Sequence, residues 1–431
     1  MERNLAKISV NSLNSLRVAL METLPELRLS KFFGGGFPAA GETISADKIF
    51  PESEHEQLAK VLDDGGLQSF VVHYIGELVY EADFLKDHTP TPLKETPLFG
   101  NLIGLAKDIS DSVTKLPYQY TIITRLFHGL AEFCDVRGFN QNLSDRLSIV
   151  SEDALPVGIF NGTLSRSARR QIDNDFMDHK APEPGANSSW LKRSYNPIYA
   201  LYRTSGSITN TYAPRLHREF YDELRVLYGY LLAAGVLENF VRIFGEDNMN
   251  SSSFSFQNKD DSGLTLSFID RLPTDIHEAS RLHFSRANRN SYIDNDGLYK
   301  LISPAISVFE SKDQRLKTAS IWMMRAMLSS RQMDIALESA IVLEVLLGDR
   351  AMSDRVGLSK LMANRCAFAL GKSQNERESL MKQFEDFYKI RSEIVHAGRY
   401  NTKKDENKSI LNGRNLARRM LMNEIRLSIL R

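Results

Sequence analysis

The chain has 431 residues, of which 42% are hydrophobic and 25% are charged, and its 54 basic and 54 acidic side chains give a formal net charge of zero. This length supports two or three domains with their own cores, and the composition excludes a disordered or fibrous protein. We expect no membrane partner, because the sequence contains neither a long apolar run nor a signal peptide. Cys134 and Cys366 lie far apart, which predicts reduced thiols in a cytoplasmic protein.

The charges are unevenly distributed along the chain. Residues 301–431 hold 23 of the 54 basic and 15 of the 54 acidic side chains, which leaves 31 basic and 39 acidic ones in residues 1–300. A basic C-terminal third beside an acidic remainder favours a polyanionic partner for the C-terminal third.

The N-terminal region, residues 1–180, is predicted to be a helical domain of unknown role. Residues 11–24 begin with capping residues and continue with apolar residues at helical spacing, and residues 118–134 are also predicted to be helical. Residues 67–84 are apolar and fit either a buried helix or a pair of strands. Residues 179–189 are rich in Pro, Gly and Ser, which predicts a linker or a long loop.

The middle region, residues 190–300, is predicted to be helical with one small β-hairpin. Residues 190–203 interleave aromatic and cationic side chains, which fits either a core segment with solvated cations or a surface that contacts RNA. Residues 215–244 carry apolar side chains on one side of a predicted helix. Residues 251–270 alternate around a polar turn and predict the hairpin.

The C-terminal region, residues 305–431, is predicted to be a four-helix up-down bundle. Residues 316–347 form a nearly continuous apolar helix, and a shorter helix covers residues 361–370. A helix beginning near residue 375 and a basic helix over residues 409–430 complete the bundle. The fold class predicted for the whole chain is therefore mainly α.

One helix of this bundle carries an unexpected cation. Leu380, Phe384, Phe387, Arg391 and Ile394 follow one another at steps of four, three, four and three, which is a single helical stripe. A guanidinium cannot be neutralised to ease its burial. We therefore expect an anion, a partner subunit or a water-filled cleft beside this arginine.

A titratable group follows the arginine after five residues. His396 lies in the last predicted turn, where the helix dipole favours a protonated imidazole, and Gly398 offers a helix stop. At about 100° per residue, Arg391 and His396 lie roughly 140° apart on an ideal helix. Either the helix end unwinds near the glycine, or two copies of the segment build the site together.

The segment Arg391-Ser-Glu-Ile-Val-His-Ala-Gly398 resembles the Arg-x4-His signature of HEPN domains, and is most similar to their Apea-like branch. The upstream segment Asp334 to Gly348 resembles the long helix of this family, with Glu344 at the position of its usual leucine-glutamate. The resemblance covers about residues 305–431. Many active members carry Asn, Asp or His after the arginine, whereas Ser392 follows it here, as is usual in the Apea-like branch.

The resemblance implies a metal-independent endoribonuclease that works as a homodimer without a cofactor. In this family the 2′-hydroxyl of the RNA attacks the phosphodiester and leaves a 2′,3′-cyclic phosphate and a 5′-hydroxyl. His396 would act as general base or acid, and Arg391 would hold the phosphate and stabilise the developing charge. Ser392 would bind a phosphate oxygen, and Glu393 would orient the imidazole or raise its pKa. The residues expected to contact RNA nearby are Tyr388, Lys389 and Arg399.

The resemblance also implies a role in bacterial anti-phage defence or abortive infection. The RNA would be tRNA, mRNA or phage RNA, and residues 1–300 would hold the nuclease inactive until a phage-derived trigger appears. The alternative is a catalytically inactive module that dimerises and binds RNA, a nucleotide or a partner protein. Substitution of His396 separates the two, because only an enzyme would lose its activity while it still folds and binds.

Overall fold

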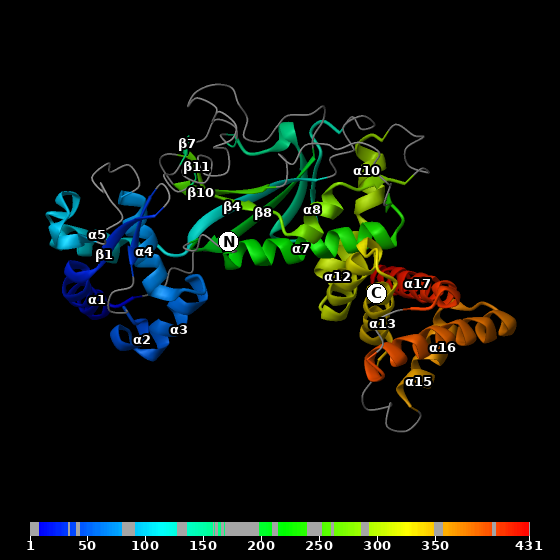
Figure 1. Ribbon diagram of the computed structural model, residues 1–431. Helices are drawn as coiled ribbons and strands as arrows, with labels where there is room; N and C mark the ends of the chain where they lie inside the picture. Colours follow the sequence, from blue (N-terminus) through cyan, green and yellow to red (C-terminus); the bar gives the residue numbers. More distant parts are fainter. Residues whose placement is uncertain are drawn as a thin grey trace.

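A computed structural model describes the chain over residues 8–32, 35–39, 44–79, 91–126, 136–157, 159, 163–164, 168, 198–208, 214–238, 252–259, 263–285, 293–348, 357–398 and 402–430. Along the sequence, the protein forms an N-terminal unit, a central β-sheet with a long helix against it, and a C-terminal group of helices (Figure 1). The sheet and its helix lie between the other two parts.

The N-terminal unit has a hydrophobic core of its own. Leu16 and Leu20 of α1 are fully buried in this core together with Ile109 of α5. The ambiguous apolar segment forms a helix, α4, over its described residues. The elements are α1 (Val10–Thr23), η1 (Leu24–Glu26), β1 (Arg28–Phe32), β2 (Gly35–Ala39), α2 (Ala46–Ile49), α3 (Glu52–Val61), α4 (Gly66–Val79), β3 (Thr91–Pro92), η2 (Leu93–Glu95), η3 (Pro97–Phe99) and α5 (Leu102–Val113), with the strands in the order β2-β1-β3.

The central part is a β-sheet that the sequence analysis did not predict. Its strand order is β5-β6-β8-β4-β10-β11-β7, and every pair is antiparallel except β11 and the two-residue β7. The prediction of a mainly α protein is therefore wrong. The strands are β4 (Tyr118–Leu126), β5 (Asn140–Asn142), β6 (Leu147–Ser151), β7 (Thr163–Leu164), β8 (Ile198–Gly206), β10 (Ser252–Lys259) and β11 (Gly263–Arg271); η4 (Glu152–Ala154) follows β6.

The strand β4 shows why the sheet was mistaken for helix. Its last five residues are all buried, so both faces of the strand are covered and the polar-apolar alternation of a half-exposed strand is missing. A short apolar run of this kind cannot be distinguished from a buried helix by its periodicity. The hairpin predicted within residues 251–270 is confirmed as β10 and β11, but it belongs to the larger sheet.

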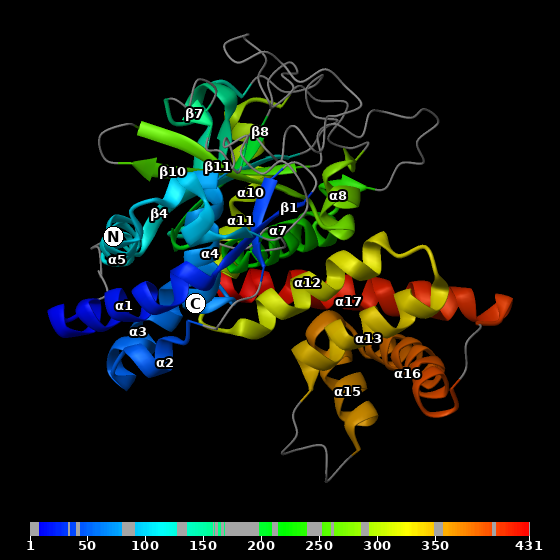
Figure 2. The same ribbon diagram turned by 60° about the vertical axis from the view of Figure 1, so that its left-hand side comes forward.

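The long helix α7 (Arg215–Ala233) links the sheet to the C-terminal helices, as both ribbon views show (Figures 1 and 2). It begins where the sequence predicts and ends eleven residues before the expected end at residue 244. Gly229 permits a close approach to α12, because a Cβ there would overlap the backbone of Ser320. One hydrophobic cluster therefore continues from the sheet through α7 into the C-terminal helices. Smaller elements here are β9 (Leu237–Glu238), α8 (Thr274–Ser280) and β12 (His283–Phe284).

A buried polar network attaches α7 to the sheet. The Nε2 atom of His217 lies 2.5 Å from Oγ of Ser255, and Nδ1 lies 3.2 Å from the hydroxyl of Tyr221. That hydroxyl donates to Oδ2 of Asp270 at 2.8 Å. His217 is fully buried, so these hydrogen bonds satisfy polar atoms that water does not reach.

The C-terminal helices differ from the predicted four-helix bundle. The expected continuous helix over residues 316–347 is interrupted where Ser329 takes an extended conformation (φ −60°, ψ 134°), so α12 and α13 are separate helices. Five long helices, α12, α13, α15, α16 and α17, pack together (Figure 2). The elements are α10 (Asn295–Ile302), α11 (Pro304–Glu310), α12 (Gln314–Leu328), α13 (Gln332–Leu347), α15 (Leu358–Leu370), α16 (Gln374–His396), η6 (Lys404–Glu406) and α17 (Asn407–Ile429).

Candidate site on helix α16

The helix α16 carries the Arg-x4-His motif. Ser373 caps its first turn, since the serine side chain accepts a hydrogen bond from the backbone N–H of Glu376 at 3.2 Å. Phe384 and Phe387 are fully buried, and Gly413 of α17 lies so close that a Cβ would overlap the Phe387 ring. This tight packing fixes the position of the helix and of the side chains beside its buried stripe.

Arg391 has an intramolecular anion as its partner. Its Nη2 atom lies 2.9 Å from Oε1 of Glu344 on α13, and the two side chains are only 20% and 26% exposed. The guanidinium also lies over the ring of Tyr388, 5.5 Å from its centroid. Of the three environments expected for this arginine, the structure therefore shows the anion.

Tyr388 belongs to the same contact between α13 and α16. Its hydroxyl donates a hydrogen bond to Oε1 of Glu344 at 2.9 Å, and its ring stacks on Phe384 at 5.7 Å between centroids. Burial, followed by the nearby Glu344 carboxylate, raises the pKa of Tyr388 to about 12. The hydroxyl therefore keeps its proton at neutral pH and holds Glu344. Tyr388 was predicted to contact RNA, whereas the structure places it between helices.

His396 lies at the exposed end of α16. The helix is regular through this residue: the backbone N–H of Ala397 donates to the carbonyl oxygen of Glu393 at 3.1 Å. Gly398 then takes a positive φ of 62°, which ends the helix. Because the helix does not unwind before His396, one copy of α16 does not bring this imidazole onto the face of Arg391.

The remaining predicted site residues lie around this end of the helix. Lys389 is exposed, and Ser392 and Glu393 are half-exposed, while Arg399 lies outside the described residues. Within the described part of the chain, no residue forms a hydrogen bond or an ion pair with His396. Its neighbour Val395 is 47% exposed, so an apolar side chain lies at the surface next to the histidine in the sequence.

Glu344 is the residue that the sequence analysis named but did not assign to the site. The signal for it is a carboxylate in a helix that is apolar on almost every side, opposite an arginine in another apolar stripe. Two charges that each interrupt a buried surface are best stabilised by one another.

The second segment that was considered as an RNA surface, residues 190–203, is only partly within the described residues. Of the aromatic and cationic segment 190–203, only residues 198–203 are described, and they form most of β8. Tyr199 and Tyr202 are buried within the sheet. These tyrosines therefore support the core interpretation and do not form a stacking surface for bases.

No cluster of three or more histidine, cysteine or carboxylate side chains suited to a metal ion occurs among the described residues. In the same part of the chain, every helix is too short or too polar to cross a bilayer. Comparison with family models, curated proteins and solved structures found no match to this chain.

Proposed function

We propose that the protein is a metal-independent endoribonuclease in which Arg391 and His396 cleave a phosphodiester bond. The resemblance of residues 391–398 to the HEPN signature suggests this chemistry. The observation that carries the proposal is the contrast between the two side chains: Arg391 is held by Glu344 and Tyr388, whereas His396 is exposed at the helix end. A fixed cation and a free acid/base are the two groups that this reaction needs.

The site is completed by a second copy of the chain. Two α16 helices that meet near their C-terminal ends would bring His396 of one copy towards Arg391 of the other, which a regular helix cannot do within one copy. The exposed Val395 would provide apolar contact area for this association. The partner proposed for the protein is therefore another copy of itself, with RNA bound between the two.

The proposed reaction needs no group beyond these side chains and the RNA. The imidazole of His396 accepts the proton of the 2′-hydroxyl, whose oxygen then forms a bond to phosphorus. The bond between phosphorus and O5′ breaks, and an imidazolium returns a proton to that leaving oxygen. Arg391 stabilises the negative charge on the phosphoryl oxygens. The products are a 2′,3′-cyclic phosphate and a 5′-hydroxyl.

In the cell, we propose a cytoplasmic nuclease of anti-phage defence that residues 1–300 restrain until a phage-derived trigger binds. The basic C-terminal third would attract the RNA, whether tRNA, mRNA or phage RNA. The test is expression of residues 301–431 alone in bacteria, with its folding and dimerisation checked. Restraint predicts a fragment at least as toxic as the whole chain, and a harmless folded dimer would refute it.

The second candidate function is an inactive module that binds RNA, a nucleotide or a partner protein. One observation favours it: the charge of Arg391 is already balanced by Glu344, as expected of a residue that stabilises an interface between helices. The two candidates differ in what His396→Ala does. It abolishes cleavage in the first and leaves binding unchanged in the second.

Mixing two inactive variants tests the composite site. Arg391→Ala and His396→Ala should each cleave RNA at least about 100-fold more slowly than the unmodified chain. In a mixed dimer, the arginine of one copy and the histidine of the other restore one of two sites. Half of the dimers in an equal mixture are mixed, so about a quarter of the activity should return. A mixture that exchanges subunits and stays inactive would rule out the composite site.

A further inference from the structure

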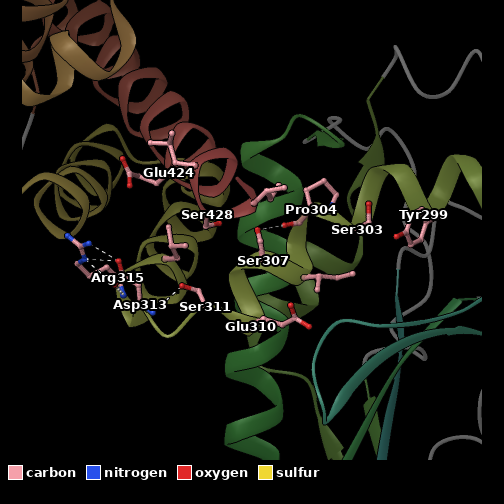
Figure 3. A pocket seen from close by; sticks show the side chains of 14 residues that line it. Tyr299, Ser303, Pro304, Ser307, Glu310, Ser311, Asp313, Arg315, Glu424 and Ser428 are labelled. Carbon is pink, nitrogen blue, oxygen red and sulfur yellow. Dashed lines mark hydrogen bonds and ion pairs between the residues drawn. The ribbon is translucent and has the colours of Figure 1, made fainter. Parts of the chain in front are cut away.

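A cavity of about 720 Å³ opens between α10, α11, the start of α12 and the C-terminal end of α17. In the view of Figure 3, the labelled lining residues extend from Arg315 on one side to Tyr299 on the other. Its volume lies within the range of sites that hold small molecules. None of the residues of the proposed nuclease site lines it, so it is a separate place on the molecule.

The cavity wall carries an excess of negative charge. It contains three carboxylates, those of Glu310, Asp313 and Glu424, and one cation, Arg315, which leaves a net charge of −2. Arg315 is committed to Asp313: its Nη2 donates to Oδ2 at 2.7 Å and its Nε to Oδ1 at 3.0 Å. Glu310 is exposed and forms no hydrogen bond or ion pair with another described residue. This charge balance disfavours nucleotides, phosphates and other anions.

Two of the hydroxyl groups in the wall add hydrogen-bond acceptors. Ser307 donates its proton to the carbonyl oxygen of Pro304 at 2.8 Å, and Ser428 donates its proton to that of Ile425 at 2.7 Å. Each hydroxyl has one proton to give, so towards the cavity both oxygens offer only lone pairs. A surface of carboxylates and acceptor hydroxyls matches a ligand that donates several hydrogen bonds.

Apolar side chains also line the cavity. Ile306 and Leu316 line the side formed by α11 and α12, and Leu427 lines the side formed by α17. An alkyl chain would contact these residues while its charged ends reach the carboxylates. An ammonium group is the cation that combines three donors with attachment to such a chain.

We propose that this cavity binds a linear aliphatic polyamine, with one ammonium group near Glu310 and another near Glu424. The inference goes beyond the proposed nuclease function and does not depend on it, since binding is measured on the full chain without RNA. The net negative charge, the acceptor groups of the wall and its apolar side chains all select the same chemical class.

Isothermal titration calorimetry of the full-length protein with spermidine at low ionic strength tests the proposal. We expect saturable binding of one molecule per chain, and a Kd at least about tenfold weaker for the double variant Glu310→Gln/Glu424→Gln. Circular dichroism should show the same fold for this variant. Glu56→Gln is the matched control, because Glu56 is an exposed carboxylate on α3, outside the cavity, and should leave the Kd unchanged.

Two further results would overturn the inference. If spermidine does not bind saturably, or binds the double variant as well as the unmodified chain, the cavity is not a polyamine site. A second comparison uses 1,4-diaminobutane and 1-aminobutane, which differ in one ammonium group. The diamine should bind at least about tenfold more tightly; equal affinities would refute recognition of two ammonium groups.

Discussion

Replacing Glu344 with glutamine tests the role of the carboxylate that holds Arg391. One oxygen of this carboxylate accepts from both Nη2 of Arg391 and the hydroxyl of Tyr388, each at 2.9 Å. Glutamine keeps the size and an accepting oxygen but removes the negative charge. The change therefore makes the hydrogen bond from the Tyr388 hydroxyl a neutral one, and it leaves the cation of Arg391 without a balancing negative charge.

The expected loss of stability follows from these contacts. A hydrogen bond to a charged group contributes about 1.5–3 kcal/mol and a neutral one about 0.5–1.5 kcal/mol. Both side chains retain some exposure, 20% for Arg391 and 26% for Glu344, and water screens part of the difference. We therefore expect Glu344→Gln to lower the free energy of unfolding by about 1 kcal/mol, measured by urea denaturation.

Glu344→Gln should change RNA binding and RNA cleavage in opposite directions. The net charge of the chain rises from zero to +1, so RNA binding should tighten slightly at low salt. The guanidinium loses its fixed orientation, so kcat should fall by about tenfold to 100-fold. Asp334→Asn is the matched control, since it makes the same charge change on α13 beside Arg331. Unchanged or faster cleavage by Glu344→Gln would refute the positioning role.

Three further predictions concern the fold. Gly229→Ala places a methyl group against the backbone of Ser320 and should lower the free energy of unfolding, measured by urea denaturation, by about 3 kcal/mol. Gly76→Ala has open space around it and should stabilise α4 by about 0.5–1 kcal/mol. Equal effects of the two variants would refute the close approach of α7 to α12. His217→Ala removes the centre of the buried network and should cost about 3 kcal/mol; a loss below about 1 kcal/mol would contradict its role. Burial raises the pKa of Tyr230 to about 12. The protonated hydroxyl should therefore contribute about 2–3 kcal/mol to the free energy of unfolding below about pH 10, and this contribution should be lost as the pH rises through about 12. A Tyr230→Phe variant should show a smaller loss of stability over that interval.

Parts of the fold that are visible in short sequence patterns were predicted from the sequence. The helix α16 begins within one residue of its predicted start, because its apolar residues recur at helical spacing and Ser373 supplies a cap. The hairpin of β10 and β11 was found because its residues alternate around a polar turn. The sheet as a whole was missed, because β8 and β4 are buried on both faces and carry no alternating pattern.

The candidate site shows the same division between local and long-range information. The motif and the exposed position of His396 follow from one helix and its end. The ion pair between Arg391 and Glu344 joins residues that are 47 positions apart and depends on how α13 packs against α16. The break at Ser329 that separates α12 from α13 also lacks a local signal, since neither proline nor glycine occurs there.

End-group analysis of RNA cut by the purified full-length protein tests the central claim most directly. The reaction is run with a metal chelator, with and without an extract of phage-infected bacteria as the source of the trigger, beside His396→Ala, whose fold is confirmed by circular dichroism. The proposed function predicts new 5′-hydroxyl and 2′,3′-cyclic phosphate ends from the unmodified chain and their loss in the variant. Equal cleavage by the variant, products with 3′-hydroxyl ends, or no cleavage by either protein in any of the three RNA classes would contradict it.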